Sequence, residues 1–282
     1  MPLVINSNIA SLTAQRYLDV ARRGLDNSLA KLASGQRIVR ASDDAAGMGI
    51  SEVLKAQIRG LAQASRNAND GISMSQVAEG AMNEQASILT RLRELAIQAA
   101  NGTLTSTDRS FIDKEAKDLT SELDRISLVT EYDGLKMLTG VGAAATTMQV
   151  GIRGTANDTV NVTFFNTGSV SLGIVYSVGG AVDLGTSSTS AQASIANLDT
   201  AIATLSTDRA GIGADTNRLM FTINNLASAR ENVAAANSRI RDVDVASETA
   251  EMTRTEILTQ AGTSILAQAN QLPAAALALI KG

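Results

Sequence analysis

The residue types that perform most enzyme chemistry are scarce in this chain. It has no His and no Cys, so the usual metal ligands and the commonest nucleophile–base pairs are missing. Carboxylate chemistry remains, and Asp43 and Asp44 form an adjacent pair in a polar connector. We interpret them as a helix cap and a connector charge, because no second acidic cluster or basic partner stands nearby. The sequence therefore predicts that the chain is not an enzyme and uses no metal or cofactor.

Two stretches contain residue types that accept glycans. Residues 186–190 are all Thr or Ser, which O-linked sugars require, and Asn157-Asp158-Thr159 fits the N-glycosylation pattern. Hydroxyl-rich runs are more often exposed loops, and the tripeptide is common by chance. We therefore interpret the first stretch as a loop and keep both as modification hypotheses.

Composition also limits the partners. The net charge is −4 with both signs mixed, and the chain has only three Tyr, four Phe and no Trp. A nucleic-acid surface would be basic and would carry stacking rings, so we expect no nucleic-acid partner. The longest apolar run, residues 273–280, has eight residues and is too short to cross a membrane. The first residues lack the basic region and long apolar core of a cleaved secretory signal.

The clearest helical pattern lies between Ile195 and Ile240. Its apolar residues recur at spacings of three, four and seven, which is the heptad pattern of a helix that packs against another helix. Burying these side chains is worth on the order of 20 kcal/mol, so the stripe needs helices opposite it. The stripe consists of Ile195, Leu198, Ile202, Leu205, Ile212, Leu219, Ile223, Leu226, Val233 and Ile240.

Similar stripes predict helices over residues 5–33, 45–100 and 106–126. The short link at Asn101-Gly102 predicts that the second and third of these form an antiparallel hairpin. We expect Ser42 or Asp43 to cap the helix 45–100 and Ser106 or Thr107 to cap the next one. Residues 132–134 then turn the chain out of helix.

The apolar period changes to two in the middle of the chain. Two alternating runs flank a turn at residues 156–158, which predicts a β-hairpin. A further strand is predicted over residues 170–176, followed by loop up to residue 190. The alternating residues of the hairpin are Met148, Val150, Ile152, Val160, Val162 and Phe164.

The two ends of the chain carry apolar stripes that lie outside this bundle. The ends can pair with each other, but the pair would have a thin core, and Pro273 is expected to interrupt the hydrogen-bond ladder near the end of the last helix. We hypothesise that the ends are loose in the free chain and become ordered when other copies bury them. The residues expected to drive this assembly are Ile5, Ile9, Leu12, Leu25, Leu29, Leu32, Leu258, Ile265, Leu266 and Leu272.

The predicted fold is mainly α. It is an antiparallel coiled-coil helical bundle built from both the N- and C-terminal parts, with a small β-hairpin region in the middle. Four segments of the sequence are specific enough to carry a resemblance. The segments are Ile5-Asn6-Ser7-Asn8 with Leu29-Ala30-Lys31-Leu32-Ala33-Ser34-Gly35-Gln36-Arg37-Ile38, then Ala41-Ser42-Asp43-Asp44-Ala45-Ala46-Gly47, then residues 91–102, and finally residues 260–271. By these segments, which occur in the family's order and cover both ends, the chain resembles bacterial flagellin, the subunit of the flagellar filament.

The resemblance implies a domain organisation and a set of partners. Residues 1–40 and 245–282 would form a terminal inner-tube domain, residues 41–140 and 190–244 a helical outer-tube domain, and residues 141–189 a short β-rich variable region. The protein would be exported unfolded through the flagellar type III apparatus and would form a homopolymer in the extracellular filament. An export chaperone and a cap protein would be its other partners.

The resemblance also implies a receptor contact. Arg91, Leu95 and Glu115 match positions by which many flagellins engage the vertebrate innate receptor TLR5, although Thr90 stands where many stimulatory members carry Gln. The simpler interpretation places these residues in an interface between neighbouring subunits. Three other functions stay open: a junction protein between hook and filament, a coiled-coil adaptor or signalling module, and an enzyme in the central segment, which the absence of His opposes.

Overall fold

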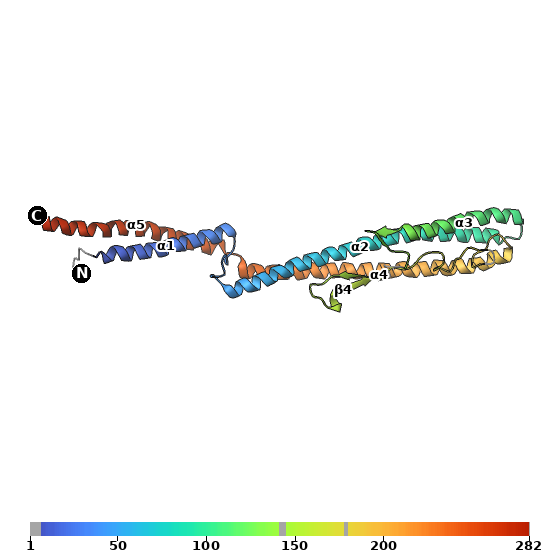
Figure 1. Cartoon of the computed structure of the whole chain (residues 1–282), viewed down its shortest axis with the longest axis horizontal. Helices are drawn as coiled ribbons and strands as arrows, with labels where there is room; N and C mark the ends of the chain where they lie inside the picture. Colours follow the sequence, from blue (N-terminus) through green and yellow to red (C-terminus); the bar gives the residue numbers. More distant parts are fainter. Residues whose placement is uncertain (1–6, 141–144, 178–179, 282) are drawn as a thin grey trace. The chain divides into compact units, whose positions relative to one another are not determined.

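The computed structural model describes residues 7–140, 145–177 and 180–281, with residues 272–281 described by their backbone alone. Helices dominate this part of the chain (Figure 1): α1 (Ile9–Ser34), α2 (Ala45–Ala99), α3 (Ser106–Val129), α4 (Ser188–Arg241) and α5 (Val245–Lys281). The strands β1 (Glu131–Tyr132) and β2 (Leu135–Lys136) form one antiparallel ribbon. The strands β3 (Thr146–Gln149) and β4 (Thr159–Val162) form another, with the short 3-10 helix η1 (Ala156–Asp158) between them. The predicted fold class is confirmed.

The chain divides into two compact units. The terminal unit comprises Met1–Ile58 and Glu231–Gly282, and the central unit comprises Arg59–Arg230. Both α2 and α4 contribute residues to each unit. The division into inner-tube, outer-tube and variable domains at residues 40, 140, 190 and 244 stays a prediction.

In the terminal unit, α1 and α5 lie side by side and antiparallel (Figure 1). The Asn8 side chain donates to the carbonyl of Ala269 at one end of the pair. Lys31 forms an ion pair with Glu248, at 3.6 Å, at the other end. α1 ends at Gly35 as expected, because this glycine adopts the left-handed conformation that closes a helix.

The connector after α1 uses its two carboxylates differently from the prediction. Asp44 caps α2, since its carboxylate accepts the Gly47 amide at 2.8 Å, so the expected cap at Ser42 or Asp43 is wrong. Asp43 instead accepts the amides of Val39 and Arg40, at 3.1 and 2.8 Å, and folds the connector. These hydrogen bonds, led by that from Arg40, lower the pKa of Asp43. The interpretation of the pair as cap and connector charge is therefore confirmed.

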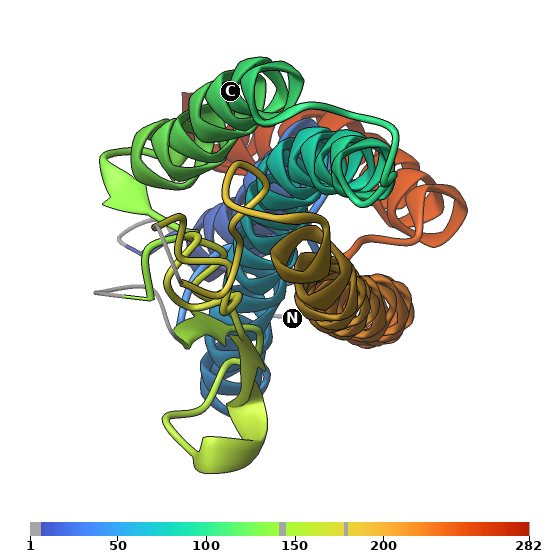
Figure 2. The same ribbon diagram turned by 90° about the vertical axis from the view of Figure 1, so that its right-hand side faces the viewer.

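In the central unit, α2 and α3 form the predicted antiparallel hairpin, and α4 packs against it (Figure 2). Leu198, Leu205, Ile212 and Leu219 follow one another at intervals of seven along α4 and are all buried. The heptad pattern therefore identified the buried face of this helix. The cap of α3 is Thr105 rather than Ser106 or Thr107, because Thr105 and Asp108 form a reciprocal capping box.

The β region is smaller than predicted. The β3–β4 hairpin is confirmed, but the expected strand over residues 170–176 is wrong. Gly173 lies in the left-handed region, with a φ of +71°, and residues 168–174 form successive turns. Their apolar side chains Leu172 and Ile174 are buried in the core without joining a sheet. Hydrogen bonds hold the segment in place, since the amide and hydroxyl of Ser169 donate to the Asp124 carboxylate at 2.7 and 2.8 Å.

The predicted turn after α3 is confirmed, and it has a further role in the fold. The turn at residues 132–134 also closes the ribbon of β1 and β2, because Asp133 and Gly134 have positive φ values of 52° and 77°, as a tight hairpin turn needs. At the C-terminus, α5 continues through Pro273 to Lys281, so the proline does not end the helix. Proline removes one backbone hydrogen bond, but its fixed φ is itself helical.

Candidate assembly surface

Small residues form the seam between α1 and α5. A methyl group added to Gly262 would lie 3.2 Å from Leu18 Cδ1, and one added to Gly24 would lie 3.1 Å from Thr255 Cγ2. The helices therefore approach closely where these glycines stand. The Ser11 hydroxyl adds a hydrogen bond to the side chain of Asn270, at 2.8 Å. Because small and polar residues occupy the seam, few large apolar side chains can be buried in it.

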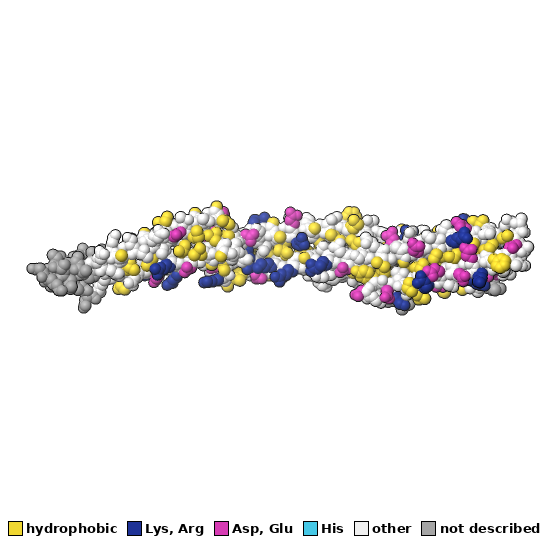
Figure 3. Space-filling view, turned by 90° about the horizontal axis from the view of Figure 1, so that it is seen from above, with side chains coloured by type: hydrophobic (Ala, Val, Ile, Leu, Met, Phe, Trp, Pro, Cys, Tyr) yellow, Lys and Arg dark blue, Asp and Glu magenta, His cyan; other side chains and the backbone are white. Residues whose placement is uncertain are grey.

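Large apolar side chains instead cover the outside of this pair (Figure 3). Ile9 is 67% exposed and Leu12 is 62% exposed, while Leu258 and Ile265 are 50% and 56% exposed. Monomeric proteins rarely show so many large apolar side chains on one pair of helices, and such surfaces mark interaction sites. The exposed set is Ile9, Leu12, Tyr17, Val20, Leu29, Val245, Ile257, Leu258 and Ile265, which we call the terminal apolar surface.

The structure locates most of the residues that the sequence predicted for assembly. Five of them belong to the terminal apolar surface: Ile9, Leu12, Leu29, Leu258 and Ile265. Leu25, Leu32 and Leu266 are half-buried. Ile5 and the side chain of Leu272 lie outside the described residues.

Sequence reasoning missed four members of this surface: Tyr17, Val20, Val245 and Ile257. Tyr17 and Val20 are three residues apart on α1, so they share a face, and a count of apolar residues on both sides of the helix would have found them. Ile257 directly precedes the predicted Leu258, and only the exposure of both side chains shows that the apolar surface wraps around α5.

The three residues matched to the receptor contact do not share one surface. Arg91 and Glu115 are exposed, and the Arg91 guanidinium donates to Glu115 through Nε at 3.0 Å and Nη2 at 2.8 Å. It also donates to Glu94 at 3.0 Å, and these bonds, led by that to Glu115, raise the pKa of Arg91. Leu95 is only 1% exposed and packs in the core of the central unit. Arg91 and Glu115 are therefore available to a partner, whereas Leu95 supports the helices beneath them.

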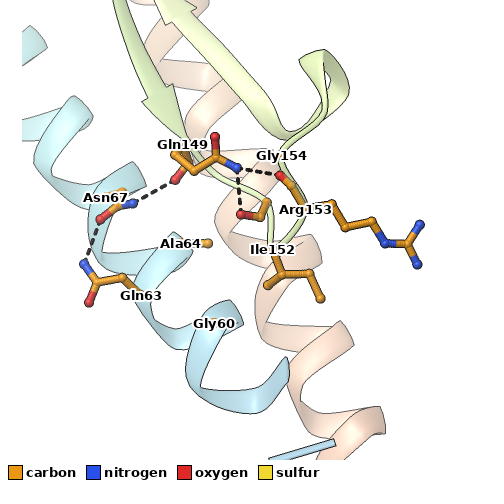
Figure 4. Close-up of a pocket in the computed structure, with 9 residues that line it drawn as sticks. Gly60, Gln63, Ala64, Asn67, Gln149, Ile152, Arg153 and Gly154 are labelled. Carbon is orange, nitrogen blue, oxygen red and sulfur yellow. Dashed lines mark hydrogen bonds between the residues drawn. The ribbon is translucent and has the colours of Figure 1, made fainter. Parts of the chain in front are cut away.

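Two grooves flank the β3–β4 hairpin where it meets α2. The first holds about 360 Å³ and lies between the 60–67 segment of α2 and the loop after β3 (Figure 4). Asn67 donates to the carbonyl of Gln149, at 2.9 Å, and Gln63 donates to Asn67, at 2.8 Å. The second groove holds about 650 Å³ and lies between α2, the β1–β2 ribbon and β3.

The two grooves were compared with the requirements of a metal site. Within the described ranges, no group of three or more acidic residues is placed to hold a metal ion. In the same part of the chain, no helix is long and apolar enough to cross a membrane. The hydroxyl run at 186–190 also has structural contacts, since the Thr186 hydroxyl donates to Asp183 at 2.6 Å.

Comparison with known proteins gives one consistent result. Residues 5–143 match the bacterial flagellin N-terminal helical region, and residues 195–280 match the bacterial flagellin C-terminal helical region. A flagellin of Halalkalibacterium halodurans is 42% identical over 279 residues, which cover 99% of this chain and 100% of that protein. The flagellar filament 33 kDa core protein of Treponema phagedenis is 40% identical over 295 residues, with 99% and 100% covered. A crystal structure of Bacillus cereus flagellin is 32% identical and covers 61% of this chain and 94% of that chain, with a TM-score of 0.49.

Proposed function

Because this chain belongs to the bacterial flagellin family, the structural subunits of the flagellar filament, we propose that it is exported and self-assembles into an extracellular filament for swimming. The terminal apolar surface is the observation that carries this proposal. Its side chains are largely exposed in the single chain, and neighbouring copies would bury them. Association is then driven by the hydrophobic effect, which is roughly proportional to the apolar area removed from water.

The composition of the seam supports assembly rather than a finished monomeric fold. α1 and α5 bury Leu18, Ala21 and Ala269 between them, together with the hydroxyls of Ser11 and Thr255. So few buried carbon atoms stabilise a helix pair weakly, because ordering each residue costs about 1–2 kcal/mol of backbone entropy. Copies packed around the pair would supply the missing burial. The terminal helices would then gain order on assembly.

Membership of the family supports further partners. We propose that the chain leaves the cell through the flagellar type III apparatus, with an export chaperone before secretion and a cap protein at the growing tip. A secondary recognition by TLR5 would use the exposed pair Arg91 and Glu115, with Leu95 acting only through the packing of α2. Thr90, whose hydroxyl donates to Ala86 of its own helix, leaves that position without the amide of Gln.

Seeded growth tests the main proposal. Purified chain is mixed with short filament fragments, and polymer is measured by sedimentation and electron microscopy. We expect long filaments from the full chain and none from a chain that lacks residues 245–282. A full chain that stays monomeric with seeds, or a truncated chain that grows as well as the parent, would refute the role of the terminal helices.

Receptor recognition needs a separate assay. Reporter cells that express the receptor are exposed to monomer, and the signal is compared with that from Arg91→Ala. Loss of the Arg91 guanidinium removes both its hydrogen bonds to Glu115, so we expect a weaker signal. The absence of any signal from the parent chain would end the receptor proposal without affecting the filament proposal.

A further inference from the structure

We propose that the larger groove of the central unit receives a basic loop from a second copy of this chain. The inference rests on the proposed function, because it needs copies that assemble. It adds a polar contact, in the central unit, to the apolar burial proposed for the terminal helices. The groove acts as acceptor and the loop after β3 acts as donor.

The acceptor groove has an apolar floor and an acidic rim. Met74 is buried in its floor, and the volume of about 650 Å³ exceeds that of a single side chain. Gly71 shapes one wall, because a methyl group there would lie 3.2 Å from Met148 Cγ and 3.0 Å from Leu219 Cδ1. The glycine thus lets β3 lie close to α2. The residues lining the groove are Asp70, Met74, Tyr132, Asp133, Leu135 and Met148.

The chemistry of the rim selects a cation with an apolar stem. Asp70 and Asp133 are exposed, and neither has an ion pair in residues 7–140, 145–177 and 180–281. Tyr132 also lines this groove, and an aromatic ring can accept a guanidinium over its face. Arginine suits the floor, the carboxylates and the ring of this groove. Its methylenes cover apolar surface, while its planar head pairs with carboxylates.

The donor loop presents such a side chain on a braced support. The Gln149 amide donates to the carbonyls of Gly151 and Arg153, at 3.0 and 2.9 Å. Ile152 packs over Gly60, where a methyl group would lie 2.9 Å from Ile152 Cγ2. The Arg153 side chain projects away from α2 (Figure 4), and it has no ion pair among the described residues. A loop held in this way loses little entropy when it binds.

The placement of donor and acceptor suits an open polymer. The loop and the groove are different patches on the same unit, so Arg153 of one copy would meet Asp70 and Asp133 of the next. Such head-to-tail contacts repeat without closing unless a rotation happens to form a ring. The charges would also discriminate between alternative offsets of neighbouring copies, because a shifted neighbour leaves all three charges unpaired.

Neutral variants test the contact in the seeded-growth assay. Arg153→Gln and Asp133→Asn are each expected to raise the critical concentration for growth by about three- to tenfold, as loss of a partly desolvated charge pair does. Asn tolerates positive φ as Asp does, so D133N keeps the turn of the β1–β2 ribbon. Lys114→Gln removes an exposed charge on α3 and serves as the matched control, with an expected change below about twofold.

A charge reversal separates specific pairing from loss of charge in general. Arg153→Glu alone should grow poorly, and adding Asp70→Lys and Asp133→Asn to it should restore growth toward that of the parent. Circular dichroism melting checks that every variant folds like the parent. If the parent grows and R153Q and D133N grow equally well, this inference is wrong while the filament proposal stands. If the reversal is not rescued in folded protein, the predicted partners are wrong as well.

Discussion

Leu12→Ala should separate the energy of assembly from the energy of folding. Leu12 is 62% exposed in the single chain, so its side chain contributes little to the stability of the monomer. We expect the free energy of unfolding to change by less than about 0.5 kcal/mol, as for other exposed positions. Leu18, on the seam of the same helix, is the matched control because it is only 5% exposed and packs against Gly262.

The size of the assembly effect follows from the exposed area. Leu12→Ala removes three carbon atoms, each worth about 0.8 kcal/mol when buried. Roughly two thirds of this burial would come from neighbouring copies, which amounts to about 1.5 kcal/mol per added subunit. The critical concentration for seeded growth should therefore rise about tenfold. Leu18→Ala should instead destabilise the α1–α5 pair in the monomer by about 2–3 kcal/mol.

Sedimentation after seeded growth measures the critical concentration, and hydrogen exchange on the monomer measures the protection of α1 and α5. The reasoning would be refuted by a Leu12→Ala chain that polymerises at the parental concentration. It would also be refuted by a loss of monomer protection as large as that caused by Leu18→Ala. The first result would mean that the exposed side of α1 is not where copies meet, and the second that Leu12 stabilises the monomer itself.

Three further predictions concern stability. Leu198 belongs to the buried heptad row of α4, so Leu198→Ala should lower the free energy of unfolding of the central unit by about 2–5 kcal/mol. Denaturant titration measures this loss, and a loss below about 1 kcal/mol would contradict the heptad core. Thr105→Ala breaks the capping box with Asp108 and should lower the free energy of unfolding by about 1 kcal/mol in the same titration. Thr107 is an exposed neighbour outside the capping box, so Thr107→Ala should lower it much less. The hydrogen bond from Arg241, at 2.6 Å, lowers the pKa of Glu52 in the folded state, so its stabilisation is present above pH ~4.5 and is lost as pH falls through the folded pKa. Melting temperatures recorded from pH 7 to pH 3 should show a shallower decline for Glu52→Gln than for the parent, and equal slopes would contradict this role.

Long-range periodicity was the reliable part of the prediction. The heptad row of α4 and the hairpin of α2 and α3 could be predicted because each apolar stripe needs a complementary stripe, and few arrangements satisfy all of them. Shorter features were harder. The strand expected over residues 170–176 alternates correctly, yet its backbone turns at Gly173 and buries Leu172 and Ile174 without strand pairing. Alternation alone does not tell a strand from an irregular segment packed against helices.

The amino-acid sequence by itself determined the helical class, the antiparallel pairing and the absence of His- or Cys-based chemistry, because hydrophobic period and residue type are local properties of the chain. The tertiary structure decided which side of each terminal helix is covered. Both sides of α1 carry apolar residues, and only the close approach at Gly24 and Gly262 turns one side inward and leaves Leu12 and Tyr17 in water. It also decided that Asp70, Asp133 and Tyr132 share one groove, since α2 and the β1–β2 ribbon are far apart in sequence and meet only through packing.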